Sequence, residues 1–108
     1  MINWKMVWQL REDVGKDDFS EVVEIFIEEV SATIHRLRHT PDIKTLGADL
    51  HALKGSALNL GFTEFSDLCQ AGETLAAQGK ADQIVLLPIL DSYDVSKDAL
   101  IAGLKQRA

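Results

Sequence analysis

Apolar residues recur along most of the chain at the three- and four-residue spacing of an amphipathic helix, and the alternation typical of a half-buried strand is almost absent. The longest apolar stripe comprises Phe19, Val22, Val23, Phe26, Val30, Ile34 and Leu37. Four glutamates lie mostly on the opposite side of the same helical wheel: Glu21, Glu24, Glu28 and Glu29. The pattern predicts a long amphipathic helix with an acidic, solvated face.

Helix-capping and helix-breaking residues predict where the first helices begin and end. A short helix is expected from about residue 4 to residue 14, ending at Gly15. The spacing of Asp18 and Glu21 predicts a capping box at the start of the long second helix. The segment Thr40-Pro41-Asp42 is expected to stop this helix and to start the third, because proline suits a first helical turn.

The second half of the chain continues in the same way. The third predicted helix ends near Gly61, and its apolar stripe comprises Leu46, Leu50, Leu53, Ala57 and Leu60. Thr63 is expected to cap a fourth helix, which ends at Gly79 and carries the apolar residues Phe65, Leu68, Cys69, Leu75 and Ala76. A last helix is expected from about residue 82 to residue 105, and Pro88 inside it should kink or divide it.

Four long amphipathic helices with short connections favour an all-α fold, an antiparallel up-down four-helix bundle. The short additional N-terminal helix should cover one end of it. A chain of 108 residues fits one domain with a modest core, so residues 1–108 are expected to form a single unit.

Composition and charge exclude several classes of protein. A formal net charge of -6 argues against a protein that binds the phosphate backbone of a nucleic acid. No apolar run approaches the roughly 20 residues that span a bilayer, and the N-terminal residues lack the layout of a secretory signal. The single cysteine, Cys69, suits a reducing cytoplasm and is expected to be a small core residue.

The third helix displays a histidine among unusually small neighbours. His51 points about 130° away from the centre of the leucine stripe, so it should face solvent or a partner. The positions one turn away include Gly47, Ala48 and Gly55, and glycine inside a helix costs about 1 kcal/mol relative to alanine. These small residues, with the exposed apolar Leu58 further along, predict a face on which a large partner approaches the imidazole closely.

The run His51-x-Leu53-Lys54-Gly55-Ser56-Ala57-x-x-Leu60-Gly61 resembles the motif of histidine-containing phosphotransfer (HPt) domains, the helical carriers of two-component phosphorelays. The resemblance covers nearly the whole chain, from the segment 10–15 to Leu68-Cys69, Glu73 and the turn at Gly79. The chain departs from the expected pattern at Gly72, where a larger apolar residue is expected.

The chemistry of this face and the resemblance together assign roles to several side chains. A neutral imidazole attacks phosphorus readily, so His51 is the expected phosphorylated residue. Lys54, one turn away, is expected to neutralise charge on the phosphoryl oxygens, and Gly55 to keep the approach open. The resemblance implies that Glu73 orients the ring of His51; Gln70 is the alternative, and a merely solvated Glu73 is a further one.

The same reasoning predicts the partners. Gly47, Ala48 and Leu58 are expected to contact them. The chain has no glycine-rich phosphate loop, so it should not be a kinase by itself. It should receive the phosphoryl group from the aspartyl phosphate of one response-regulator receiver domain and give it to the aspartate of another, and a hybrid sensor kinase is a further expected partner. No cofactor and no metal site are expected here, because the receivers carry the magnesium. The protein is expected to be a cytoplasmic monomer that binds neither nucleic acid nor membrane.

Two other functions are compatible with the pattern. One is a kinase-derived dimerisation domain, which would need a partner chain, and the other is a helical adaptor with an incidental histidine. His35 and His39 stand four residues apart and could bind zinc, but with no third ligand nearby they more simply complement the helix dipole. Trp4 and Trp8 are expected to cover the core, with partner contact as the alternative.

Overall fold

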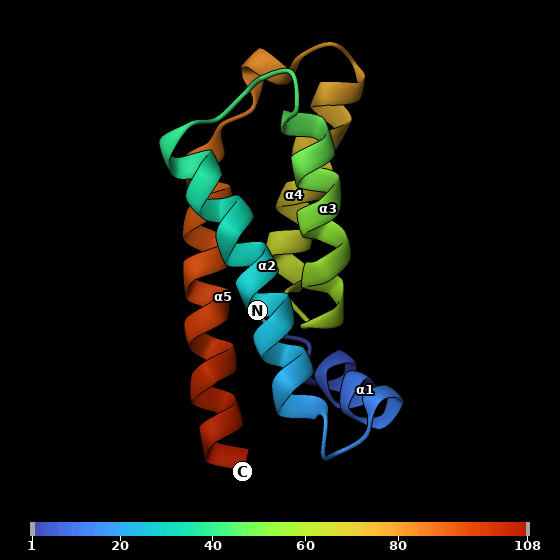
Figure 1. The fold of residues 1–108 in the computed structure, drawn as a ribbon. Helices are drawn as coiled ribbons and strands as arrows, with labels where there is room; N and C mark the ends of the chain where they lie inside the picture. Colours follow the sequence, from blue (N-terminus) through green and yellow to red (C-terminus); the bar gives the residue numbers. More distant parts are fainter. Residues whose placement is uncertain (1, 108) are drawn as a thin grey trace.

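The computed structural model describes residues 2–107, which form five α-helices and one short 3-10 helix. The elements in chain order are α1 (Trp4–Val14), α2 (Phe19–His39), α3 (Leu46–Asn59), α4 (Thr63–Ala77), η1 (Ala81–Gln83) and α5 (Leu86–Arg107). Helices α2 to α5 run alternately up and down, and α1 lies at the end of the bundle opposite the α2–α3 and α4–α5 connections (Figure 1). The predicted four-helix bundle with an additional N-terminal helix is confirmed.

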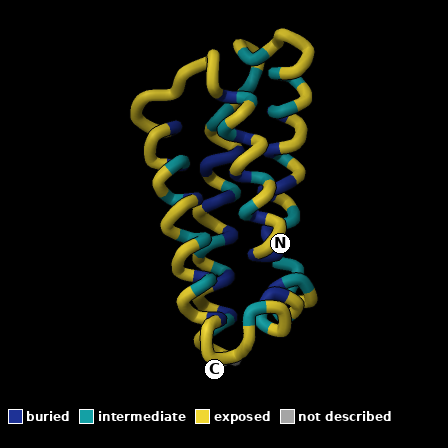
Figure 2. The backbone as a smooth tube through the Cα atoms, turned by 45° about the vertical axis from the view of Figure 1, so that its right-hand side comes forward, coloured by how far each residue is buried: buried dark blue, intermediate teal, exposed yellow. Residues whose placement is uncertain are grey.

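The core lies between α2, α3, α4 and α5, where the buried positions turn inward (Figure 2). All five predicted residues of the third-helix stripe are buried: Leu46, Leu50, Leu53, Ala57 and Leu60. In α2, Val22 and Phe26 are partly buried against the core and the other five residues of the stripe are buried. Burying one such large side chain stabilises a fold by about 1.5–3 kcal/mol, so these two stripes fix the rotation of α2 and α3.

The first two helices begin differently from each other. Helix α1 has the predicted bounds, and the Asn3 side chain caps it by accepting a hydrogen bond from the backbone N–H of Met6 at 3.3 Å. Asp18 is the N-cap residue of α2, but its side chain makes no capping hydrogen bond, so the predicted capping box is wrong. The backbone of Asp18 is helical (φ -97°, ψ -9°), whereas a capping side chain usually requires an extended backbone at this position.

Helix α3 begins at Leu46, five residues after Pro41, so the proline does not lie in its first turn as expected. Residues 43–45 form a turn in which the Asp42 carboxylate accepts a hydrogen bond from the backbone N–H of Lys44 at 2.9 Å. The backbone N–H of Thr45 donates to the carbonyl of Asp42 at 3.1 Å. An aspartate that bonds its own backbone two residues on favours a turn, and this local bonding delays the helix.

The boundaries of the last two helices are also set locally. Thr63 is the first residue of α4 and Phe62 the N-cap, so the predicted cap at Thr63 is wrong by one position. Pro88 divides the last predicted helix, as expected: η1 ends at Gln83, α5 begins at Leu86, and Pro88 lies in its first turn, where a missing N–H costs nothing.

Two glycines bring α3 and α4 unusually close together. A Cβ atom at Gly72 would lie 2.6 Å from Cδ1 of Leu50, and one at Gly47 would lie 2.8 Å from Cβ of Ala76. The expectation of a larger apolar residue at position 72 is therefore wrong, because the Leu50 side chain fills that space. This close packing sets the distance between polar side chains on the outer faces of the two helices.

Candidate functional site

A cluster of polar side chains joins the outer faces of α3 and α4. Nδ1 of His51 lies 2.6 Å from Oε1 of Glu73. The amine of Lys54 donates to Oε2 of Glu73 and to Oε1 of Gln70, each at 2.7 Å. His51 and Lys54 are neighbours one turn apart on α3, and Gln70 and Glu73 are neighbours one turn apart on α4. The four side chains form what we call the His51 cluster.

The cluster is anchored at one end and open at the other. Gln70 donates through its Nε2 to the hydroxyl of Thr74 at 3.2 Å, which holds the amide that binds Lys54. The exposed fractions of the Lys54 and Glu73 side chains are 21% and 24%, whereas that of His51 is 69%. Of the three ionisable side chains in the cluster, His51 is therefore the one that is open to solvent.

The charge of Glu73 determines which of the two imidazole nitrogens of His51 carries a hydrogen. Hydrogen bonds from Lys54 and then from His51 lower the pKa of Glu73, so this group is a carboxylate at neutral pH. A carboxylate only accepts hydrogen bonds, so Nδ1 of His51 must carry the shared proton. In the neutral ring, Nε2 then has the lone pair and faces away from this bond, as a nucleophile requires.

A groove of about 470 Å³ runs from His51 toward the α2–α3 connection. Small residues from α3, α4 and η1 line much of it: Gly47, Ala48, Ala76, Ala77 and Ala81. Ile43 and Lys44 also line it, and Ile43 is 52% exposed. Sequence reasoning missed Ile43; an isoleucine in a connection between two helices was the available signal.

The predicted partner-contact residues lie in different surroundings. Ala48 is exposed beside His51, and Gly55 is exposed with no atom within 4 Å of where its Cβ would be. Gly47 lines the groove, but its packing against Ala76 also gives it a structural role. Leu58 is exposed, but it lies two helical turns from His51, in a recess shared with Met6 and Gln9 of α1.

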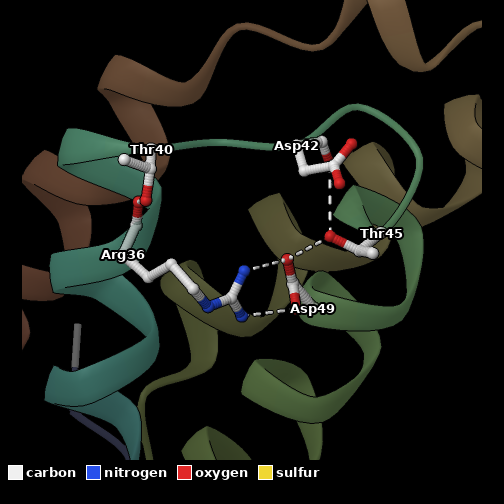
Figure 3. A network of polar contacts seen from close by, with 5 residues as sticks. All are labelled: Arg36, Thr40, Asp42, Thr45 and Asp49. Carbon is white, nitrogen blue, oxygen red and sulfur yellow. Dashed lines mark hydrogen bonds and ion pairs between the residues drawn. The ribbon is translucent and has the colours of Figure 1, made fainter.

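An ion pair that the sequence did not predict clamps α2 to α3 (Figure 3). Nη1 and Nη2 of Arg36 donate to Oδ2 and Oδ1 of Asp49 at 2.9 and 2.7 Å, and the Thr45 hydroxyl donates to Oδ2 of Asp49 at 3.3 Å. The bidentate geometry fixes Asp49 two residues before His51. Arg38 pairs with Asp94 of α5 through a single contact of 2.6 Å, which joins α2 to α5.

The other residues of interest lie outside the His51 cluster. His35 and His39 are exposed, and their rings lie with centroids 4.3 Å apart and planes tilted by 49°. Within residues 2–107 no group of three or more His, Cys, Asp or Glu side chains could hold a metal ion. Cys69 is fully buried in the core, as expected, and burial raises the pKa of its thiol to about 12.

Trp4 and Trp8 are partly buried against the core, with ring centroids 5.8 Å apart, which favours the prediction that they cover it. None of the described helices is both long and apolar enough to cross a membrane.

The model of the Hpt domain family matches residues 21–105 of the chain. The matched segment contains the whole His51 cluster and most of the four-helix bundle, but not α1. Comparisons with curated proteins and with solved structures give no match.

Proposed function

Because this chain belongs to the Hpt domain family, whose members carry out histidine phosphotransfer, we propose that it is a phosphorelay intermediate. His51 accepts a phosphoryl group from the aspartyl phosphate of one receiver domain and passes it to an aspartate of another. The observation that carries the proposal is the hydrogen bond between His51 and Glu73 on an otherwise exposed imidazole.

The His51–Glu73 geometry suits each step of the reaction. Nε2 of His51 attacks phosphorus, the N–P bond forms, and the bond from phosphorus to the aspartyl oxygen breaks, which leaves the receiver with a free carboxylate. The ring becomes a cation that keeps its Nδ1 proton, and the Glu73 carboxylate 2.6 Å away stabilises that charge. Attack by a second receiver aspartate on the same phosphorus reverses the sequence.

Lys54 supports the reaction from the buried side of the cluster. Two of its three N–H donors are used by Gln70 and Glu73, which hold the carboxylate in place. The third donor is available for the oxygens of the phosphoryl group, where a cation neutralises the charge that moves during transfer. In this proposal Glu73 orients the ring, and Gln70 contributes only by positioning Lys54.

The surface around His51 suits the docking of a compact receiver domain. Gly55 and Ala48 leave the space on either side of the imidazole open, and Ile43 offers an apolar contact at the far end of the groove. Magnesium belongs to the receiver in this scheme. We propose that the protein acts as a monomer, since its four helices bury a core without a partner chain, and that it acts in the cytoplasm, where a free cysteine such as Cys69 stays reduced.

The decisive experiment offers the protein a phosphorylated receiver domain labelled with ³²P. We expect the label to move to this chain in an acid-labile, base-stable form, and His51→Gln to remove it. Undiminished transfer to His51→Gln would disprove the assignment. A folded protein that accepts no label from any receiver would favour a helical adaptor, and a dimer in light scattering would favour a kinase-derived dimerisation domain.

A further inference from the structure

A second cavity lies at the end of the bundle where α1 packs against α2 and α5, away from the His51 cluster. Its volume is about 320 Å³. The apolar part of its lining consists of Trp8, Phe19, Val23 and Leu104. It shares no lining residue with the groove beside His51.

Two cations line the same cavity without an acidic counterpart. Arg11 and Lys16 are lining residues, and no carboxylate is among them. The Arg11 guanidinium lies 5.7 Å from the centre of the Trp8 ring, which itself lies 6.3 Å from the Phe19 ring. Within residues 2–107 neither cation takes part in an ion pair. Arg11 and Lys16 therefore place two positive charges beside the Trp8 and Phe19 rings, with no carboxylate to neutralise them there.

This arrangement has the composition of a ligand site. Pockets for small molecules are lined mostly by apolar and aromatic side chains, with a few polar groups that fix orientation. Arginine and lysine bind carboxylates and sulfonates through charge-assisted hydrogen bonds. Trp8, Arg11, Lys16 and Phe19 all precede residue 21, so the two cations and the two aromatic residues of the lining lie outside the segment that the Hpt family model matches, whereas Val23 and Leu104 lie within it.

We propose that the cavity between α1, α2 and α5 binds a small organic anion, with an apolar body against Trp8 and Phe19 and one anionic group on Arg11 and Lys16. The net negative charge of the protein disfavours anions elsewhere on its surface. A specific anion site should therefore prefer an anion to a neutral molecule of the same shape, whereas nonspecific binding to an apolar surface should not.

Two fluorescent probes with the same aromatic body test the proposal on the full chain. 1-Anilinonaphthalene-8-sulfonate carries the anionic group, and N-phenyl-1-naphthylamine lacks it. Both are titrated into the wild type, into the double variant Arg11→Gln/Lys16→Gln, and into Lys44→Gln/Lys80→Gln. The last variant removes the same charge from exposed residues 44 and 80 in the connections at the other end of the bundle.

We expect the Arg11→Gln/Lys16→Gln variant to bind the sulfonate about tenfold or more weakly than the wild type, because charge-assisted hydrogen bonds are lost. Binding of the neutral probe should stay within about twofold, and the Lys44→Gln/Lys80→Gln variant should behave as the wild type. Amide shifts caused by the sulfonate should map to residues 8–23 and 104. Equal sulfonate affinities, no binding to the wild type, or shifts centred on His51 would each overturn the proposal.

Circular dichroism of the double variant is recorded first. If that variant does not fold, Lys16→Gln decides alone, because residue 16 is exposed between α1 and α2 and its substitution should leave packing intact. A Lys16→Gln affinity for the sulfonate equal to that of the wild type would then count against the proposal.

Discussion

Oε1 of Glu73 lies 2.6 Å from Nδ1 of His51, and the two residues stand on adjacent antiparallel helices. The contact depends on the close approach of α3 and α4 at Gly47 and Gly72, where any Cβ atom would collide with the opposite helix. The packing of small residues and the chemistry of the imidazole are therefore linked: the helices are spaced so that a carboxylate reaches the ring.

Glu73→Ala should slow phosphoryl transfer to His51 by roughly tenfold or more, because the ring loses the hydrogen bond that fixes its tautomer. Glu73→Gln should retain part of the rate, since an amide oxygen accepts from Nδ1–H without carrying charge. Single-turnover transfer kinetics measure both, and ¹⁵N shifts of the imidazole report the tautomer. An Ala variant that transfers at the wild-type rate, with an unchanged tautomer, would remove Glu73 from the mechanism.

The contribution of Glu73 to stability should depend on pH in a defined direction. Its pKa is lowered in the folded protein by Lys54 and then by His51, so the ionised form stabilises the fold above the usual pKa of 4.5. That stability is lost as the pH falls through the lowered pKa of the folded state. Urea midpoints of wild type and Glu73→Gln should differ at pH 7 and converge as the pH falls below the lowered pKa of Glu73. A constant difference would show that the pairing does not act through charge.

Leu53→Ala should destabilise the bundle by about 2–5 kcal/mol, the usual cost of truncating a buried leucine. Leu53 is 2% exposed although it stands only two residues from the exposed His51. Leu58→Ala is the matched control on the same helix, and it should change the free energy of unfolding by no more than about 0.5 kcal/mol. Denaturant midpoints separate the two, and a loss below about 1 kcal/mol for Leu53→Ala would contradict its place in the core.

The features of the fold that could be predicted are those that depend on the spacing of apolar residues within one helix. The stripes of α2 and α3 follow from periodicity alone, so their buried faces and the outward direction of His51 were predictable. The first residues of the helices were less predictable, because Asp42 and Asp18 could each either cap a helix or adopt another local backbone conformation. Asp42 formed a turn with Lys44, and Asp18 kept a helical backbone, and spacing does not distinguish these choices.

Contacts between distant residues needed the packed structure. The family resemblance indicated that Glu73 reaches the ring of His51. The periodicity of the sequence did not predict that the Lys54 amine donates hydrogen bonds to Glu73 and Gln70. The Arg36–Asp49 clamp depends on how the end of α2 meets the first turn of α3. The role of Gly72 depends on the Leu50 side chain of another helix, which no analysis of one helix can supply.

Lys54→Ala should slow transfer or shorten the lifetime of phospho-His51 more than it harms stability. The substitution removes a cation that binds Glu73 and has a further donor for the phosphoryl oxygens. Lys54→Arg should retain part of the effect, because the charge persists while the geometry changes. Lys80→Ala, at an exposed lysine that does not line the groove beside His51, is the control. Transfer rates and phosphate lifetimes are measured at low and high salt. If they are the same in the wild type and all three variants, Lys54 has no role in transfer.

Gly55→Trp should block transfer while the bundle stays folded. No atom lies within 4 Å of where a Cβ at position 55 would be, so the fold has room for the side chain, and the residue stands one turn from His51 where a receiver must approach. Gly55→Ala should keep transfer and stabilise the helix by up to about 1 kcal/mol. Gly47→Ala is the contrasting variant on the same helix: its Cβ would lie 2.8 Å from Cβ of Ala76, so overpacking should outweigh the gain in helix propensity and lower the unfolding midpoint. Circular dichroism and transfer kinetics on the three variants distinguish blocked access to His51 from disturbed packing between α3 and α4. A folded Gly55→Trp variant that transfers at the wild-type rate would show that receivers do not approach His51 along this part of α3.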